Sequence, residues 1–106
     1  MTYRVVFAPE ALMQLDALED YLASAASPTL AAQYVDAIIR HCEGLSTFPL
    51  RGNCRDDLMP GLRITHYRHS TIIAFIAEPK TATVSILGVF YGGQDYDSHW
   101  RQEHDE

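Results

Sequence analysis

The stretch that most constrains the fold is Ala82 to Asp95, ATVSILGVFYGGQD, in which an apolar segment runs directly into two glycines. Apolar groups occur at both odd and even positions, and a period of two places these positions on opposite faces of a strand inside a sheet. Gly92 and Gly93 allow backbone angles that other residues avoid, so we expect the strand to end there in a sharp turn. Tyr91 and Gln94 are therefore expected at an end of the sheet.

Two matched amphipathic helices are predicted upstream, because apolar residues recur at steps of four and three. The first begins at Pro9 after Ala8, a poor capping residue, and the second begins at Pro28 after the capping residue Ser27. A hairpin of two helices cannot bury both apolar stripes within itself, so we expect it to lie on a sheet. The stripes are Ala11, Leu15, Leu18, Leu22 and Ala25 in the first helix, and Ala31, Val35, Ile38, Cys42 and Leu45 in the second.

The remaining segments complete the predicted sheet. Tyr3 to Phe7, Leu62 to Arg68 and Thr71 to Ala77 have strand patterns, and the last two are joined by a short turn to each other and to the final strand. Thr47 to Gly61 contains two prolines and two glycines without periodicity, which indicates a long loop. The prediction is an α+β fold of order β-α-α-β-β-β, with a helical hairpin on a mainly antiparallel, four-stranded sheet.

Residues 1–106 are expected to form one domain, since a chain of 106 residues builds one core. Residues 96–106 form an acidic C-terminal segment, for which we expect a short helix carrying Trp100 or partial disorder. Hydrophobic residues make up 47%, but no run reaches the length of a membrane span and no signal peptide is visible, which favours a cytoplasmic protein. In that compartment Cys42 and Cys54 are expected to be reduced.

The formal net charge of −6 argues against general nucleic-acid binding, which requires clustered lysine and arginine. Positive charge is instead local, in the middle of the chain, where four arginines fall within eighteen positions. These arginines either contact a partner or pair with nearby carboxylates. The candidate target-contact residues are Arg51, Arg55, Arg63, Arg68, Tyr91 and Gln94.

Four local sequences resemble the ParE branch of the RelE/ParE superfamily of toxins, and they occur in that family's order. They are YRVVFAPEA near the start, FPLRG at Phe48 to Gly52, RDDLMPGLR at Arg55 to Arg63, and VFYGGQD at Val89 to Asp95. The predicted order of elements is also similar to that of the superfamily. The resemblance covers nearly the whole chain up to Asp95.

The resemblance implies the toxin of a type II toxin–antitoxin system that a ParD-like antitoxin neutralises and that acts on DNA gyrase by binding. It implies a hetero-oligomer with the antitoxin, without requiring a homo-oligomer. Two alternatives stay open: a RelE-like endonuclease that cuts mRNA in the ribosome, and an inactive toxin-like domain that only binds the antitoxin. The chain departs from the nuclease members of the superfamily because it is acidic.

Catalytic chemistry is not expected. RNA cleavage needs a base, an acid and cations beside the phosphate, and RelE-like nucleases take such groups from the last strands and the segment beyond. Here that segment carries Asp95 and Asp97, which would repel a phosphate. The histidines His66, His69 and His99 lack the clustered spacing of metal ligands, so neither a metal nor another cofactor is expected.

A partner is expected to cover apolar surface that one hairpin and one sheet leave exposed. Tyr34 and Ile39 widen the second helix's stripe, and together with Leu22 and Phe48 they are the candidate antitoxin-binding residues. His41 lies one step off that stripe and is expected to be solvated. The predicted core includes Leu15, Leu18, Ile38, Ile73, Phe75, Val84 and Ile86.

Overall fold

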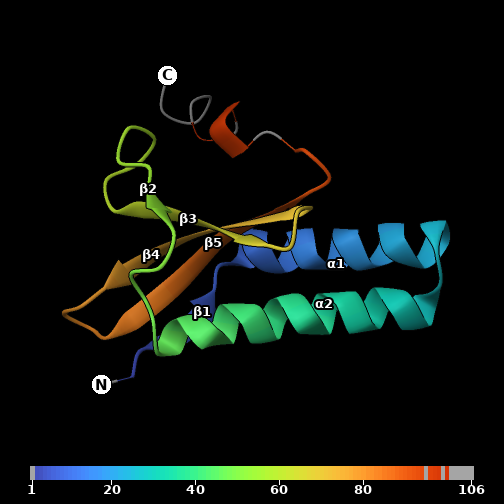
Figure 1. The fold of residues 1–106 in the computed structure, drawn as a ribbon, viewed down its shortest axis with the longest axis horizontal. Coiled ribbons are helices and arrows are strands. Elements are labelled where there is room, and N and C mark those ends of the chain that lie inside the picture. Colours follow the sequence, from blue (N-terminus) through green and yellow to red (C-terminus); the bar gives the residue numbers. More distant parts are fainter. Residues whose placement is uncertain (1, 95, 99, 101–106) are drawn as a thin grey trace.

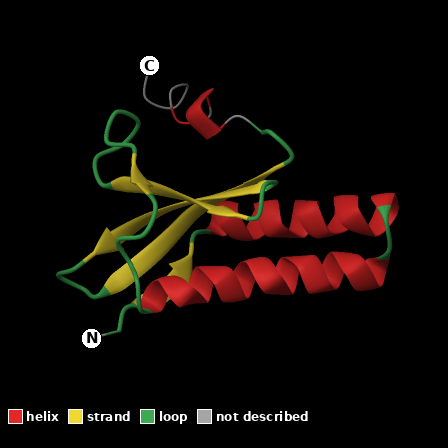
Figure 2. Ribbon diagram, viewed as in Figure 1, coloured by secondary structure: helices red, strands yellow, loops and turns green. Residues whose placement is uncertain are grey.

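A computed structural model describes residues 2–94, 96–98 and 100 of the chain. It contains one five-stranded sheet with two long helices side by side on one face (Figures 1 and 2). The first strand is parallel to its neighbour and the other neighbouring pairs are antiparallel. In sheet order the strands are β1 (Arg4–Phe7), β5 (Thr83–Tyr91), β4 (Thr71–Glu78), β3 (Leu62–Tyr67) and β2 (Asn53–Cys54), and the helices are α1 (Pro9–Ala25) and α2 (Pro28–Glu43).

The predicted α+β fold is confirmed, with one more strand than expected. The added strand, β2, consists of two residues within the predicted loop and pairs with the start of β3. Gly52 precedes it with a φ of 84°, and a Cβ at this position would collide with the carbonyl oxygen of Ile64. Only glycine fits this close approach of loop and strand, so the loop lies directly on the edge of the sheet.

The helices begin where the sequence indicates. The Ser27 hydroxyl accepts a hydrogen bond from the N–H of Leu30 at 3.1 Å, whereas Ala8 provides no side-chain cap for α1. A turn of 3-10 helix, η1 (Gly44–Ser46), follows α2 and leads into the long loop. None of the helices in the described part of the chain is long and apolar enough to cross a membrane.

The main core lies between the helix pair and the sheet. All seven predicted core residues are buried there, which confirms the apolar stripes as the faces that pack on the sheet. Burying apolar surface in this way is the principal source of stability for such a fold. Its buried members are Ala11, Leu15, Leu18, Val35, Ile38, Cys42, Leu45, Ile73, Phe75, Val84, Ile86 and Val89.

The alternation expected along the last strand is wrong beyond its middle, because β5 contains a bulge. Ala74 and Phe75 of β4 pair with Gly88 and Ile86, so that Leu87 is an additional residue of β5. One added residue reverses the faces of everything that follows it. Val89 therefore joins the helix-side core, while Phe90 lies on the opposite face.

A second, smaller core covers that opposite face. It is closed by the loop residue Leu58 and by Trp100, which lies in the C-terminal segment on the far side of the sheet from α1 and α2 (Figure 1). Residues 96–98 and 100 are helical. The second core contains Leu58, Leu62, Ile64, Ala74, Phe90 and Trp100, with Met59, Ile72, Ile76, Leu87 and Tyr96 partly buried around it.

Candidate functional site

The long loop between η1 and β3 is braced by Arg63. This side chain donates to the carbonyl oxygens of Leu50 and Arg51, the latter at 3.1 Å, and to the sulfur of Cys54 at 3.0 Å. The free carbonyls of an irregular loop need such partners, and one guanidinium supplies several donors in a fixed geometry. Arg63 thus holds the loop against the sheet edge.

The tip of this loop presents apolar surface to solvent. Phe48 and Leu50 are 61% and 66% exposed, and the guanidinium of Arg51 lies 5.6 Å from the centre of the Phe48 ring. A cation above an aromatic face is held by the ring's electron density. Phe48 and Arg51 thus form an exposed surface that is both apolar and positive, beside a shallow hollow lined by residues 47–51.

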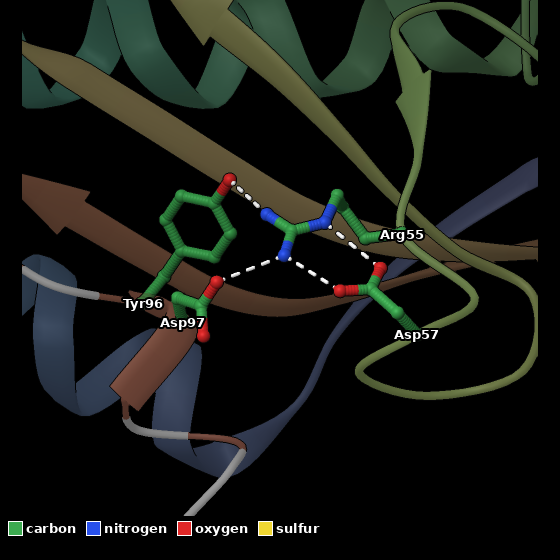
Figure 3. Close-up of polar contacts among 4 residues, drawn as sticks. All are labelled: Arg55, Asp57, Tyr96 and Asp97. Atoms are coloured by element: carbon green, nitrogen blue, oxygen red, sulfur yellow. Dashed lines mark hydrogen bonds and ion pairs between the residues drawn. The ribbon is translucent and has the colours of Figure 1, made fainter.

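Arg55 ties the loop to the C-terminal segment (Figure 3). Its Nε and Nη2 donate to both carboxylate oxygens of Asp57, at 3.0 and 2.8 Å. Its Nη2 also donates to Asp97 at 2.8 Å, and its Nη1 donates to the hydroxyl of Tyr96 at 2.8 Å. The same guanidinium lies 5.6 Å from the centre of the Tyr96 ring. All its nitrogens are thereby engaged within the protein.

The two carboxylates beside the Arg55 guanidinium stabilise its positive charge. The hydrogen bonds that Arg55 donates to Asp57, and then to Asp97, raise the pKa of Arg55 above its ordinary value. The Arg55 side chain is 24% exposed, so the bonds are only partly screened by water. The arrangement is a clamp, which we call the Arg55 clamp: Arg55, Asp57, Tyr96 and Asp97.

The four arginines do not form one patch. Arg63 and Arg55 are engaged by the loop and the C-terminal segment, whereas Arg51 and Arg68 are exposed. Arg68 lies in the turn after β3, at the other end of that strand from Arg63, with a φ of 56° and its guanidinium 5.5 Å from the Tyr67 ring centre. The exposed positive charge of this set therefore comes from Arg51 in the long loop and from Arg68 in the turn after β3.

Most of the candidate antitoxin-binding residues contribute to the main core. Leu22, Tyr34 and Ile39 are half-buried and pack against it. The hydroxyl of Tyr34 shares a hydrogen bond of 2.9 Å with that of Thr71, and its ring makes edge contacts with the rings of Tyr67 and Tyr91. Phe48, at the loop tip, is the exposed member of the set.

A groove of about 360 Å³ separates α1 from the end of β5. The backbone N–H of Tyr91 donates to the side-chain oxygen of Gln94 at 2.8 Å, and that of Val89 donates to Gln14 at 2.7 Å. Sequence reasoning identified Tyr91 and Gln94 but missed the α1 side of the groove. The sequence signal that could have identified the α1 side was Ala17 and Tyr21, which lie outside the main stripe of the helix. The α1 residues that line the groove are Gln14, Ala17, Leu18 and Tyr21.

His41 is half-buried, which corrects the expectation that it is solvated. Its ring packs 5.2 Å from that of Tyr67, and within the described residues its Nε2 is buried without a hydrogen-bond partner. Burial, and then the nearby charge of Arg51, lowers the pKa of His41. Burial together with Glu43 raises the pKa of the Cys42 thiol to about 12, so that this cysteine is an inert part of the core.

The histidines His66 and His69 are both exposed, and His66 does not lie beside Tyr91. His66 is exposed on β3 and pairs with Ile72, whose side chain belongs to the second core, whereas Tyr91 lies on the helix side. Within residues 2–94, 96–98 and 100, no group of three His, Cys, Asp or Glu side chains is placed to hold a metal ion. Asp95 and His99 lie outside the described residues.

The comparisons with known proteins identify one family and show the same fold in solved structures. A family model described as the ParE toxin of the type II toxin–antitoxin system, parDE, matches residues 5–96. The fold is similar to a chain of the chromosomal ParDE system of P. aeruginosa, with 22% identity over 85% of this chain and 96% of the other, and a TM-score of 0.72. No curated protein sequence matches the chain.

Structures of RelE-type systems also share the fold. A chain of the RelBE2 toxin–antitoxin complex of Mycobacterium tuberculosis is 20% identical, with a TM-score of 0.64 over 87% of this chain and 100% of the other. A chain of the intact RelBE complex of E. coli is 16% identical, with a TM-score of 0.57 over 87% and 99%. The family match extends over nearly the whole chain, and this chain belongs to the family of ParE toxins of type II toxin–antitoxin systems.

Proposed function

We propose that this toxin acts in the cytoplasm by binding DNA gyrase and that a ParD-like antitoxin neutralises it. The ParE family match and the similarity to a ParDE chain support this assignment. In this proposal the chain is a binding protein and not a catalyst. Its target-contact surface includes Arg51 at the loop tip, whose positive charge is exposed beside the ring of Phe48, an antitoxin-binding candidate.

The observation that carries the non-catalytic proposal is the Arg55 clamp. A nuclease of this fold needs cations free to stabilise charge on a phosphate, beside the last strands and the segment beyond them. Here that segment supplies Tyr96 and Asp97, which bind Arg55, and Asp57 adds a second carboxylate. Such a surface repels a phosphate instead of attracting it.

An mRNA endonuclease is the second candidate, because two of the similar structures belong to RelBE complexes. Its catalytic groups would have to come from His66, Tyr91 and the arginines. His66 and Tyr91 lie on opposite faces of the sheet, which argues against a shared active site. An inactive, antitoxin-binding domain is the third reading, and an activity assay separates it from the first.

The test is gyrase activity in vitro with the purified chain. We expect inhibition of supercoiling or accumulation of gyrase-dependent DNA breaks, with ribosome-bound mRNA left intact. Cleavage of that mRNA with gyrase unaffected would replace the proposal with the nuclease. Inactivity in both assays, for a chain that still binds its antitoxin, would favour the inactive domain.

Variants that remove exposed positive charges test which surface contacts gyrase. Arg51→Ala combined with Arg68→Ala removes two exposed charges and is expected to weaken gyrase inhibition on the order of tenfold. Arg40→Ala combined with Lys80→Ala is the matched control, since it removes the same charge from exposed residues of α2 and the β4–β5 turn. Equal effects of the two double variants would show that net charge matters and the loop does not.

A further inference from the structure

The tip of the long loop, residues 47–51, is exposed but held at both ends. At its start the N–H of Thr47 donates to the carbonyl of Gly44 at 3.2 Å, which attaches the tip to η1. At its end Arg63 donates to the last two carbonyls of the tip, which attaches it to β3. Because both ends are bonded to regular elements, the backbone of the loop tip has a defined shape.

Two large apolar side chains of the loop tip face the solvent. Phe48 is 61% exposed and Leu50 is 66% exposed. Covering such side chains with a partner is favourable, because it removes apolar surface from water. A tip whose backbone is already fixed loses little conformational entropy when a partner covers it, so more of this free energy appears as affinity. The loop tip therefore has the properties of a binding hot spot.

Arg51 adds a positive charge beside these apolar groups. Its guanidinium lies 5.6 Å from the centre of the Phe48 ring, and among the described residues it takes part in no hydrogen bond or ion pair. A guanidinium held at an aromatic ring keeps its N–H donors, whose geometry matches the two oxygens of a carboxylate. The loop tip is thus suited to a surface that combines an apolar pocket with an anionic group.

The charge of the whole chain favours a carboxylate over a phosphate as that anionic group. The formal net charge is −6, so a nucleic-acid backbone would repel most of the molecule while it paired with one arginine. The exposed Phe48 and Leu50 also need an apolar surface, which a row of hydrated phosphates does not provide. A protein pocket with an aspartate or glutamate at its rim matches both the apolar groups and the charge.

We propose that the loop tip anchors the toxin to its target protein. Phe48 and Leu50 enter an apolar pocket of the target, and Arg51 pairs with an aspartate or glutamate at the rim of that pocket. That the target is gyrase rests on the proposed function, whereas the chemistry of the pocket rests on the loop tip. Arg63 holds the shape of the tip and does not itself touch the target.

The first measurement is the affinity of the purified chain for purified gyrase. Phe48→Ala and Leu50→Ala should each weaken binding on the order of thirtyfold. Leu30→Ala is the matched control, because Leu30 is 57% exposed near the start of α2, and it should change the affinity by less than about twofold. All three variants should melt with the parent chain, since exposed side chains contribute little to stability. Equal losses for Leu50→Ala and Leu30→Ala would overturn the proposal.

Variants of Arg51 test the paired carboxylate. Arg51→Ala should weaken gyrase binding roughly fivefold, and Arg51→Lys should recover only part of this loss, because lysine keeps the charge without the paired donors. Since the Phe48 ring holds the guanidinium, Phe48→Ala combined with Arg51→Ala should lose less than the product of the single losses. Full binding by Arg51→Lys would overturn the paired contact. Binding to a linear DNA duplex that Arg51→Ala abolishes would assign the arginine to a phosphate instead.

Growth arrest separates the loop tip from the identity of the target. Expressed in bacteria without antitoxin, the parent chain and Leu30→Ala should arrest growth, and Leu50→Ala should do so more weakly. Arrest that needs Leu50 while gyrase is unaffected would end the proposed function and leave the anchor standing. Gyrase inhibition that Leu50→Ala and Phe48→Ala retain in full would do the reverse. Tip variants that lose only their complex with a co-expressed antitoxin would overturn the proposal, as would a parent chain without arrest or gyrase binding.

Discussion

The two faces of the sheet are covered by different kinds of structure. The helix side is closed by α1 and α2, long regular elements whose stripes bury large side chains such as Phe75 and Ile38 completely. The opposite side is closed by an irregular loop and a short C-terminal segment, joined through the Arg55 clamp. Periodic packing supports the first face and one polar cluster supports the second. We therefore expect the second face to open at a lower free-energy cost.

The largest expected effect is the difference in stability lost when a large side chain is removed from each of the two cores. Phe75→Ala removes a side chain with no exposed surface on the helix side and should lower the free energy of unfolding by about 3–5 kcal/mol. Phe90→Ala makes the same change beneath the C-terminal segment. This segment can move into the space that the ring leaves, so the change should lower the free energy of unfolding by roughly 2–3 kcal/mol. Denaturant titration followed by circular dichroism measures both losses. A larger loss for Phe90→Ala would reverse the comparison.

The next effect concerns the attachment of the loop to the sheet. Gly52→Ala should lower the free energy of unfolding by about 2–3 kcal/mol, because it forces a side chain into left-handed backbone and against the Ile64 carbonyl. Gly44→Ala is the matched control: Gly44 has a φ of −63° and open space around its Cβ position, so this variant should be neutral or slightly stabilising. Equal stability of the two variants in a thermal melt would contradict the close approach.

The helix-side face could be predicted from sequence because its signals are local. Apolar residues at helical spacing identified Leu15 and Ile38, and the Ser27-Pro28 pair identified the start of α2. The bulge at Leu87 could not be predicted, because the residues around it also fit an unbroken strand. Its position depends on which β4 residues lie opposite, and such long-range register leaves no local pattern. The two-residue strand β2 is too short for any periodicity.

The candidate site was less predictable, because a charge pattern does not tell which arginines face inward. Arg55 and Asp97 are 42 residues apart, and no spacing rule connects them. Arg63 looked equivalent to Arg51 in sequence, yet it braces the loop backbone while Arg51 stays exposed. Tyr34 was selected for lying off the main stripe, although its hydroxyl is bonded to Thr71. Tertiary contacts thus decide the roles of residues with similar local surroundings.

A smaller effect tests whether the Arg55 clamp governs the second face. Arg55→Ala leaves Asp57 and Asp97 without their shared cation and should lower the free energy of unfolding by about 1–2 kcal/mol, since the cluster is partly exposed. The chain has one tryptophan, and Trp100 is buried in the second core, so its emission reports on the C-terminal segment. We expect a red shift at denaturant concentrations where the helical circular dichroism is still intact.

Arg68→Ala is the control for the clamp, because Arg68 is an exposed arginine that contacts Tyr67 in the turn after β3. Its tryptophan emission should match that of the parent chain. Coincident loss of fluorescence and helical signal in Arg55→Ala would show that both faces unfold as one unit, and the distinction between them would then disappear.

The smallest effect is a pH dependence that arises on the helix side. Since the folded pKa of His41 lies below its unfolded value of 6.5, the unfolded chain binds the extra proton first as pH falls. The contribution of His41 to stability is therefore lost as pH drops through about 6.5 toward the folded pKa. His41→Phe keeps a ring against Tyr67, removes the buried nitrogen, and should make the free energy of unfolding fall less between pH 7 and pH 5. His66→Gln, at an exposed histidine of β3, is the matched control. A His41→Phe chain whose denaturant midpoint depends on pH as the parent's does would show that His41 contributes nothing to this acid sensitivity.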